Sequence, residues 1–154
     1  MAYTKLQAGS AIPVVPSDTI SIPAGDGVQL SSQADGTIPS KLVDSTQSFT
    51  TSVKVGYIVH NTTDGTIATV TAVDGNTQLS ISADIMANTE DYTIYAAPET
   101  NGCVLYVGGG GDLKVKMVSG KVVKFVNMQV GFVPLHVTQV YSTGTTATNI
   151  IALW

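Results

Sequence analysis

The sequence predicts an all-β chain, and three observations support this class. Val and Thr, whose branched side chains favour extended backbone, recur throughout the 154 residues. They form short runs in which apolar and polar residues alternate, the period of a strand with one buried face. The runs are separated by Gly, Asp-Gly, Ser-Gly and Asn, which are typical of turns.

The segments that fit this pattern are predicted strands, and the only plausible helical turn is residues 83–88, with Asp84 near its start. In chain order, the predicted strands are residues 12–15, 19–22, 28–31, 57–61, 66–73, 77–82, 92–96, 104–107, 113–118, 122–127, 135–141 and 149–153. The turn Asp74-Gly75-Asn76 is predicted to join two of them into a hairpin.

The hairpin of residues 113–127 can be predicted in register. A three-residue loop at 118–120 pairs Val115 with Val123. This register leaves one apolar face, and Lys114, Lys116 and Lys124 point outward from the other face. A two-residue turn would instead pair Val115 with Lys124 and mix the two faces. We therefore expect the longer loop, with Gly120 in the left-handed conformation that it requires.

The texture of the chain changes in its middle. Residues 36–98 are dense in Thr and Asp, with Asp-Gly at the bends, and they predict an inserted small β-barrel or sandwich. Residues 11–35 and 99–154 would form a split β-sandwich or jelly-roll-like outer domain around it. Residues 1–10 have no clear partner and are expected to form an N-terminal arm.

Composition excludes several classes of function. Charged residues make up 12% of the chain, about half the usual quarter, and all seven cations are lysine. An arginine-free chain with a net charge of −4 is a poor candidate for binding nucleic acid. A single cysteine, Cys103, excludes an internal disulfide and a Cys-based zinc site. No export signal or apolar run of membrane-spanning length is visible, so we expect no membrane association.

Motifs that suggest chemistry are better explained by structure. The run Gly108–Gly111 precedes a strand and not a helix, so a tight or flexible turn is favoured over a phosphate loop. His60 and His136 lack further ligands at metal-binding spacing. Asn61-Thr62-Thr63 matches a glycosylation acceptor but is interpreted as incidental. No catalytic residue, metal ligand or cofactor is predicted, and the protein is expected not to be an enzyme.

Two groups of residues remain as candidates for binding a partner. Four of the seven lysines, Lys114, Lys116, Lys121 and Lys124, lie in one hairpin, which indicates either a solvated face or a basic contact surface. The terminal Trp154 would anchor the last strand against the fold or against a neighbour. For an alternative function, glycan or receptor binding, the aromatic candidates in the insert are Tyr57, Tyr92 and Tyr95.

Four segments resemble a known family. Residues 15–20 read Val-Pro-Ser-Asp-Thr-Ile, residues 105–108 Leu-Tyr-Val-Gly and residues 111–113 Gly-Asp-Leu, and residues 138–154 include Thr-Gly-Thr-Thr-Ala and end in Ala-Leu-Trp. The chain is similar here to head-spike base proteins of tailed phages and gene transfer agents, over roughly residues 11–24 and 100–154. The intervening residues, particularly 42–46, 55–59, 61–64 and 91–95, resemble a β-module of phage structural proteins.

The resemblance implies a virion protein on the capsid exterior, made in the host cytoplasm without a signal peptide. Its partners would be the major capsid protein, copies of itself as a trimer or pentamer, and a spike fibre protein. Two positions stay open, a vertex spike base and a decoration or cement protein on the capsid facets. The alternative is a receptor- or glycan-binding module of a tail or vertex fibre.

Overall fold

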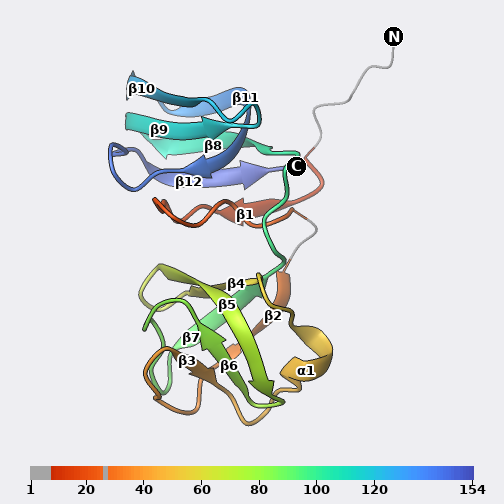
Figure 1. Ribbon diagram of the computed structural model, residues 1–154. Coiled ribbons are helices and arrows are strands. Elements are labelled where there is room, and N and C mark those ends of the chain that lie inside the picture. Colours follow the sequence, from red (N-terminus) through yellow and green to blue (C-terminus); the bar gives the residue numbers. More distant parts are fainter. Residues whose placement is uncertain (1–7, 26–27) are drawn as a thin grey trace. The chain divides into compact units, whose positions relative to one another are not determined.

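The computed structural model describes residues 8–25 and 28–154, and it confirms the predicted all-β class (Figure 1). Half of the described residues are in strands and 3% in helix, so the hydrogen-bonding pattern is almost wholly that of sheets. The chain divides into two compact units. We call residues 26–99 the insert, and residues 1–25 with 100–154 the outer unit.

The outer unit contains one six-stranded antiparallel sheet in the order β1-β12-β8-β11-β9-β10. Its strands are β1 (Ala11–Pro13), β8 (Cys103–Gly109), β9 (Gly111–Met117), β10 (Val122–Met128), β11 (Gly131–Val140) and β12 (Thr148–Leu153). The strand β11 shifts register between Val133 and Val137, where it carries Pro134. Such a bulge bends a strand, and here it lets β11 pair with both β8 and β9.

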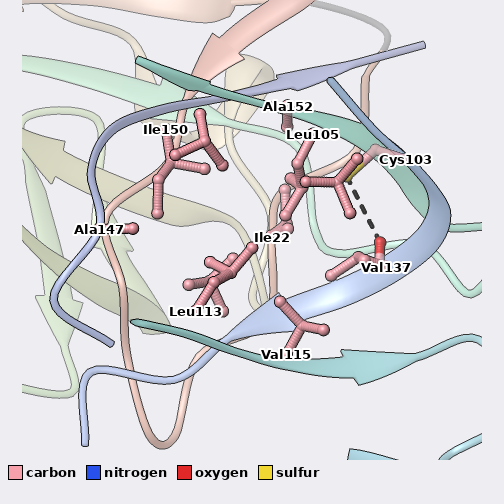
Figure 2. Close-up of a cluster of buried hydrophobic side chains, with 12 residues drawn as sticks. Ile22, Cys103, Leu105, Leu113, Val115, Val137, Ala147, Ile150 and Ala152 are labelled. Atoms are coloured by element: carbon pink, nitrogen blue, oxygen red, sulfur yellow. Dashed lines mark hydrogen bonds between the residues drawn. The ribbon is translucent and has the colours of Figure 1, made fainter. Parts of the chain in front are cut away.

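The curled sheet of the outer unit encloses an aliphatic core. Figure 2 shows Leu105, Leu113, Val115 and Ile150 directed toward one another from three strands, β8, β9 and β12. The segment before the insert closes this core, because Ile22 is buried in it and its N–H donates to the carbonyl of Thr138 at 2.9 Å.

The insert contains a second six-stranded antiparallel sheet, in the order β2-β7-β4-β5-β6-β3. Its elements are β2 (Val28–Gln33), β3 (Lys41–Val43), α1 (Phe49–Ser52), β4 (Ile58–Asn61), β5 (Thr66–Gly75), β6 (Gln78–Ile81) and β7 (Asp91–Tyr95). After β2 the chain returns to the opposite edge, where Gly36 forms a β-bridge with Val43. The two edges of this sheet therefore meet, as in a small barrel, around the buried Phe49 and Leu79.

Three sequence predictions need correction. The domain boundary expected at residue 35 lies at 25–26, because β2 pairs with β7 and so belongs to the insert. Residues 19–22 are not a strand, since the hydroxyl of Ser17 accepts the N–H groups of Thr19 and Ile20 and forms a turn. The short strand β3 was not predicted. The expected N-terminal arm, residues 1–10, lies mostly outside the described residues.

The helical turn predicted at residues 83–88 is also wrong, and within the described residues the only helix is the short α1. The polar groups of 83–88 bind other parts of the insert. The carboxylate of Asp84 accepts the N–H of Ser40 at 2.9 Å, and the N–H of Asn88 donates to Thr37 at 2.7 Å. These contacts tie the segment to other parts of the insert, and the second uses the Asn88 N–H, a donor that a helix would need.

Candidate interaction surface

The β9–β10 hairpin has the predicted register. Val115 faces Val123 and Leu113 faces Phe125, and the Met117 N–H donates to the carbonyl of Lys121 at 2.8 Å. The loop is therefore residues 118–120, and Gly120 has a φ of +83°, the left-handed conformation expected. The predictions of loop length, pairing and glycine conformation are confirmed.

The strand β10 leaves its outer edge open within the described sheet. Hydrogen bonds to β9 alternate along an antiparallel strand, and the bond at Lys121 sets their phase. Consequently the N–H and C=O groups of Val122 and Lys124 point away from β9. The opposite edge of the sheet, β1, is only three residues long and contains Pro13, so it is a poor template for a further strand.

Exposed apolar side chains are concentrated in the β9–β10 hairpin and in the segment that follows it. Of the eight large hydrophobic residues that are exposed in the described chain, six lie within residues 118–132. They are Val118, Val122, Val123, Val126, Val130 and Phe132. We call these six residues, together with Lys114, Lys116, Lys121 and Lys124, the hairpin surface.

The sequence alone did not predict the exposure of Val123. Its register places it on the apolar face, yet it is 38% exposed, and Val126 on the other face is 68% exposed. The strand β10 is the outermost strand and extends past the core that covers Leu113 and Val115. A clue in the sequence is that β10 has valines on both faces, which is unusual for a solvated edge strand.

The lysine side chains of the hairpin lie at the surface, and two of them contact neighbouring side chains. The Lys124 Nζ lies 2.9 Å from the carboxylate of Asp112, and this contact holds the pKa of Asp112 below its usual value. The Lys114 Nζ lies 4.9 Å from the ring centroid of Tyr141, within range of a cation–π interaction. Lys121, beside the loop, is exposed. These contacts orient two lysines and leave the basic face available to a partner.

Trp154 lies apart from the hairpin surface in the order of strands. It follows β12, next to the β1 edge, and its backbone N–H donates to the carbonyl of Ser10 at 3.1 Å. Its half-buried ring packs on the core of the outer unit, and a Cβ at Gly25 would overlap the ring. The side chain thus anchors its own fold, and this placement gives no support to a contact with a neighbour.

The tyrosines predicted for glycan binding are mostly inside the insert, so the expectation of exposed rings is wrong for Tyr92 and Tyr95. Tyr92 is 1% exposed, and its hydroxyl donates to Asp44 at 2.7 Å. Tyr95 is buried and stacks on His60 with ring centroids 6.3 Å apart. Tyr57 is half-buried against the same core. The face of a sugar ring could therefore not stack on the first two.

Asp44 is a buried acid that the sequence did not single out. Burial alone would raise the pKa of its carboxyl, but hydrogen bonds from Thr46, Ser32 and Tyr92 more than offset burial and lower it. Burial, with the hydrogen bond to Asp44, raises the pKa of the Tyr92 hydroxyl. The carboxylate is thus held ionised as an acceptor that joins β2, β7 and the turn after β3, a structural role.

His60, Cys103 and the glycine run, for which the sequence predicted no chemical role, contribute to the packing of the fold. Burial lowers the pKa of His60 and raises that of Cys103 to about 12, so Cys103 is an inert thiol in the core. The glycine run lies close to neighbouring backbone. At Gly110, for example, a Cβ would lie 2.9 Å from the Met128 carbonyl oxygen. His136 is exposed.

Asn61 is unsuited to accept a glycan. Its side chain is buried, and its amide donates to the Ile85 carbonyl at 2.7 Å and to Glu90 at 2.8 Å. Its oxygen accepts the N–H groups of Thr63 and Asp64. The structure therefore explains the match to the acceptor motif by a turn.

The insert has an acidic depression of about 350 Å³ on its surface. Its lining includes three acids, Asp64, Asp84 and Glu90, and apolar residues such as Pro39, Ile85 and Met86. Glu90 is engaged by Asn61 and by the Ala87 N–H, whereas Asp64 and Asp84 are exposed. The lining of the depression thus combines carboxylates with apolar side chains. This combination suits the binding of basic and apolar side chains better than the binding of an anion.

No group of three or more potential metal ligands occurs within residues 8–25 and 28–154. In the same part of the chain, no helix has the length and apolar character needed to cross a membrane. Comparisons with models of known families, with curated proteins and with solved structures found no match. The similarity to head-spike base proteins therefore stays a prediction.

Proposed function

We propose that this protein is a non-enzymatic structural subunit of a virion, a capsid decoration, cement or vertex spike-base protein. It stabilises the particle by adding β-contacts between neighbouring subunits. The observation that carries the proposal is the open edge of β10 with exposed valines on both sides. The resemblance to head-spike base proteins supplies the kind of particle.

An open edge of this kind suits the addition of a strand from another protein. The outward backbone groups of Val122 and Lys124 offer hydrogen bonds in register, and side chains on both faces of β10 offer apolar area. Apolar burial contributes about 25 cal/mol per Å². Summed over many copies on one shell, such contacts would oppose the internal pressure of packaged DNA.

The test replaces Val122 by proline. Val122 is the first residue of β10, and its N–H points away from β9, so Val122→Pro should leave the hairpin folded and remove one donor of the open edge. Virions carrying this variant should lose the protein on purification and rupture at a lower temperature than wild-type virions. Thermal rupture measured by release of packaged DNA reports the difference.

The matched control is Val55→Pro. Val55 is 62% exposed and occupies the second position of a turn in which the Tyr57 N–H donates to the Lys54 carbonyl. Gly56 follows with a φ of +94°, the type II geometry in which proline is favoured at the preceding position. Virions with Val55→Pro should behave like wild type. Equal rupture temperatures for the Val122→Pro and wild-type particles would contradict the proposal.

Antibody labelling of virions separates the two positions on the shell. An antibody against the insert should label vertices alone if the protein is a spike base, and whole facets if it is a cement protein. The absence of label from purified virions would exclude both.

A further inference from the structure

The two units carry net charges of opposite sign. The outer unit has five lysines and two aspartates, a net charge of +3, and the insert has two lysines and nine acids, a net charge of −7. Among the described residues the ion pairs are Lys41–Asp74 and Lys124–Asp112, each within its own unit. Lys114, Lys116 and Lys121 therefore have no ion-pair partner within the described part of the chain.

A symmetric contact between two hairpins is disfavoured by charge. In an antiparallel pairing of two β10 strands, the register centred on Lys124 pairs Val122 with Val126 and makes the fullest use of the outward groups. That register sets Lys124 directly across from its own copy, and like charges in this position are destabilising. A partner with carboxylates avoids this repulsion.

The acidic depression on the insert has the complementary chemistry. Asp64 and Asp84 are exposed at its rim, and Pro39, Ile85 and Met86 provide an apolar lining. The tip of the hairpin, from Val118 to Lys121, is exposed along its whole length and joins a valine to a lysine. At about 350 Å³ the depression is at the lower end of the size range of pockets that hold ligands, enough for side chains of one loop.

We propose that the loop end of the hairpin surface binds the insert of a second copy of the chain, with Lys116 and Lys121, which flank the loop from opposite faces of the hairpin, next to Asp64 and Asp84. This inference rests on the proposed function and names one partner, while the open β10 edge remains for the shell. The contact joins different patches on the two copies. It therefore generates a ring if the rotation closes, and an open chain if it does not.

Charge reversal on each side tests the contact in the full-length protein. Sedimentation velocity at low salt should show association that increases with concentration and weakens as salt is added. The hairpin variant Lys116→Glu with Lys121→Glu, and the insert variant Asp64→Lys, should each weaken self-association about tenfold or more. An equimolar mixture of the two should restore association, because the reversed hairpin of one matches the reversed insert of the other.

The control is Lys54→Glu, an exposed lysine of the insert outside the depression, which should associate like wild type. Melting curves establish that each variant is folded. A wild-type chain that is monomeric at every concentration overturns the inference. So does an insert variant that associates like wild type while the hairpin variant does not, since this pattern shows contact between two hairpins or with another acidic patch.

The outcome is separable from that of the proposed function. Suppose that Val122→Pro releases the protein from virions but the wild-type chain is monomeric. The lysines then do not bind a second copy of the chain, and only this inference fails. If the charge swap restores association but particles with Val122→Pro are as stable as wild type, the shell function fails and the contact between copies stands.

Discussion

The insert and the outer unit are both six-stranded antiparallel sheets, yet they distribute polar and apolar side chains in opposite ways. Among the residues that the structure describes, four of the five buried polar ones, Asp44, His60, Asn61 and Thr93, lie in the insert. In the same part of the chain, six of the eight exposed large hydrophobic residues lie in the outer unit. The insert also brings its sheet edges together through Gly36 and Val43, whereas the outer unit leaves β10 open.

This difference in the distribution of polar and apolar side chains indicates where each unit obtains its stability. The insert satisfies its backbone and its buried polar groups internally, and no buried side-chain polar atom in the described residues lacks a partner. The outer unit leaves apolar side chains exposed and backbone hydrogen-bonding groups unpaired at the β10 edge of its described sheet. A protein that rarely met a partner would gain nothing from this exposure, because open apolar edges promote aggregation.

The largest expected effect compares two phenylalanines. Phe49 in the insert is fully buried, and Phe132 in the outer unit is 66% exposed. Phe49→Ala should lower the free energy of unfolding by about 3–5 kcal/mol, because it leaves a cavity. Phe132→Ala should cost about 1 kcal/mol or less, the edge contact with Tyr106. Urea unfolding measures both, and similar losses would end the distinction drawn between the two units.

A somewhat smaller effect is expected at Asp44. Asp44→Ala removes the carboxylate that accepts hydrogen bonds from the Tyr92 hydroxyl and the Thr46 N–H, both inside the insert. We expect a loss of about 3 kcal/mol in the free energy of unfolding. The matched variant Asp112→Ala, which removes an exposed ion pair at the surface of the outer unit, should change stability much less than Asp44→Ala. Equal losses would show that the buried network is not what stabilises the insert.

The smallest effect is a pH dependence that belongs to His60. Burial holds the pKa of His60 below its ordinary value of 6.5, so the unfolded chain binds the proton more readily than the folded chain. The stability that depends on neutral His60 is present in full above pH 6.5 and is lost as the pH falls through the lowered pKa. In His60→Phe the midpoint of urea unfolding should change less between pH 7 and 5 than in wild type. An unaltered slope in the variant would contradict this assignment.

Local pattern was a sound guide to most of the fold. Alternation and turn residues predicted the β9–β10 pairing, because apolar side chains two residues apart must share a face. The same reasoning failed at residues 19–22, where the hydroxyl of Ser17 binds the backbone and forms a turn. It missed β3, since three residues are too short to show a period.

The candidate site was only half predictable. The clustering of Lys114, Lys116, Lys121 and Lys124 is visible in the sequence, and the structure places them in one hairpin as expected. The exposure of Val123 was not visible, because the same valine at a central strand would be a core residue. The burial of Tyr92 likewise depends on Asp44, which lies 48 residues away in the chain.

By itself the sequence determined the class of the fold, the positions of most turns and the register of the β9–β10 hairpin, because these depend on residues close together in the chain. Tertiary structure decided which strands share a sheet, as when β1 pairs with β12 and β2 with β7. It thereby decided which edge stays open. An open edge is the absence of a neighbour, and strands distant in sequence are placed side by side only when their hydrogen bonds and shared core form together.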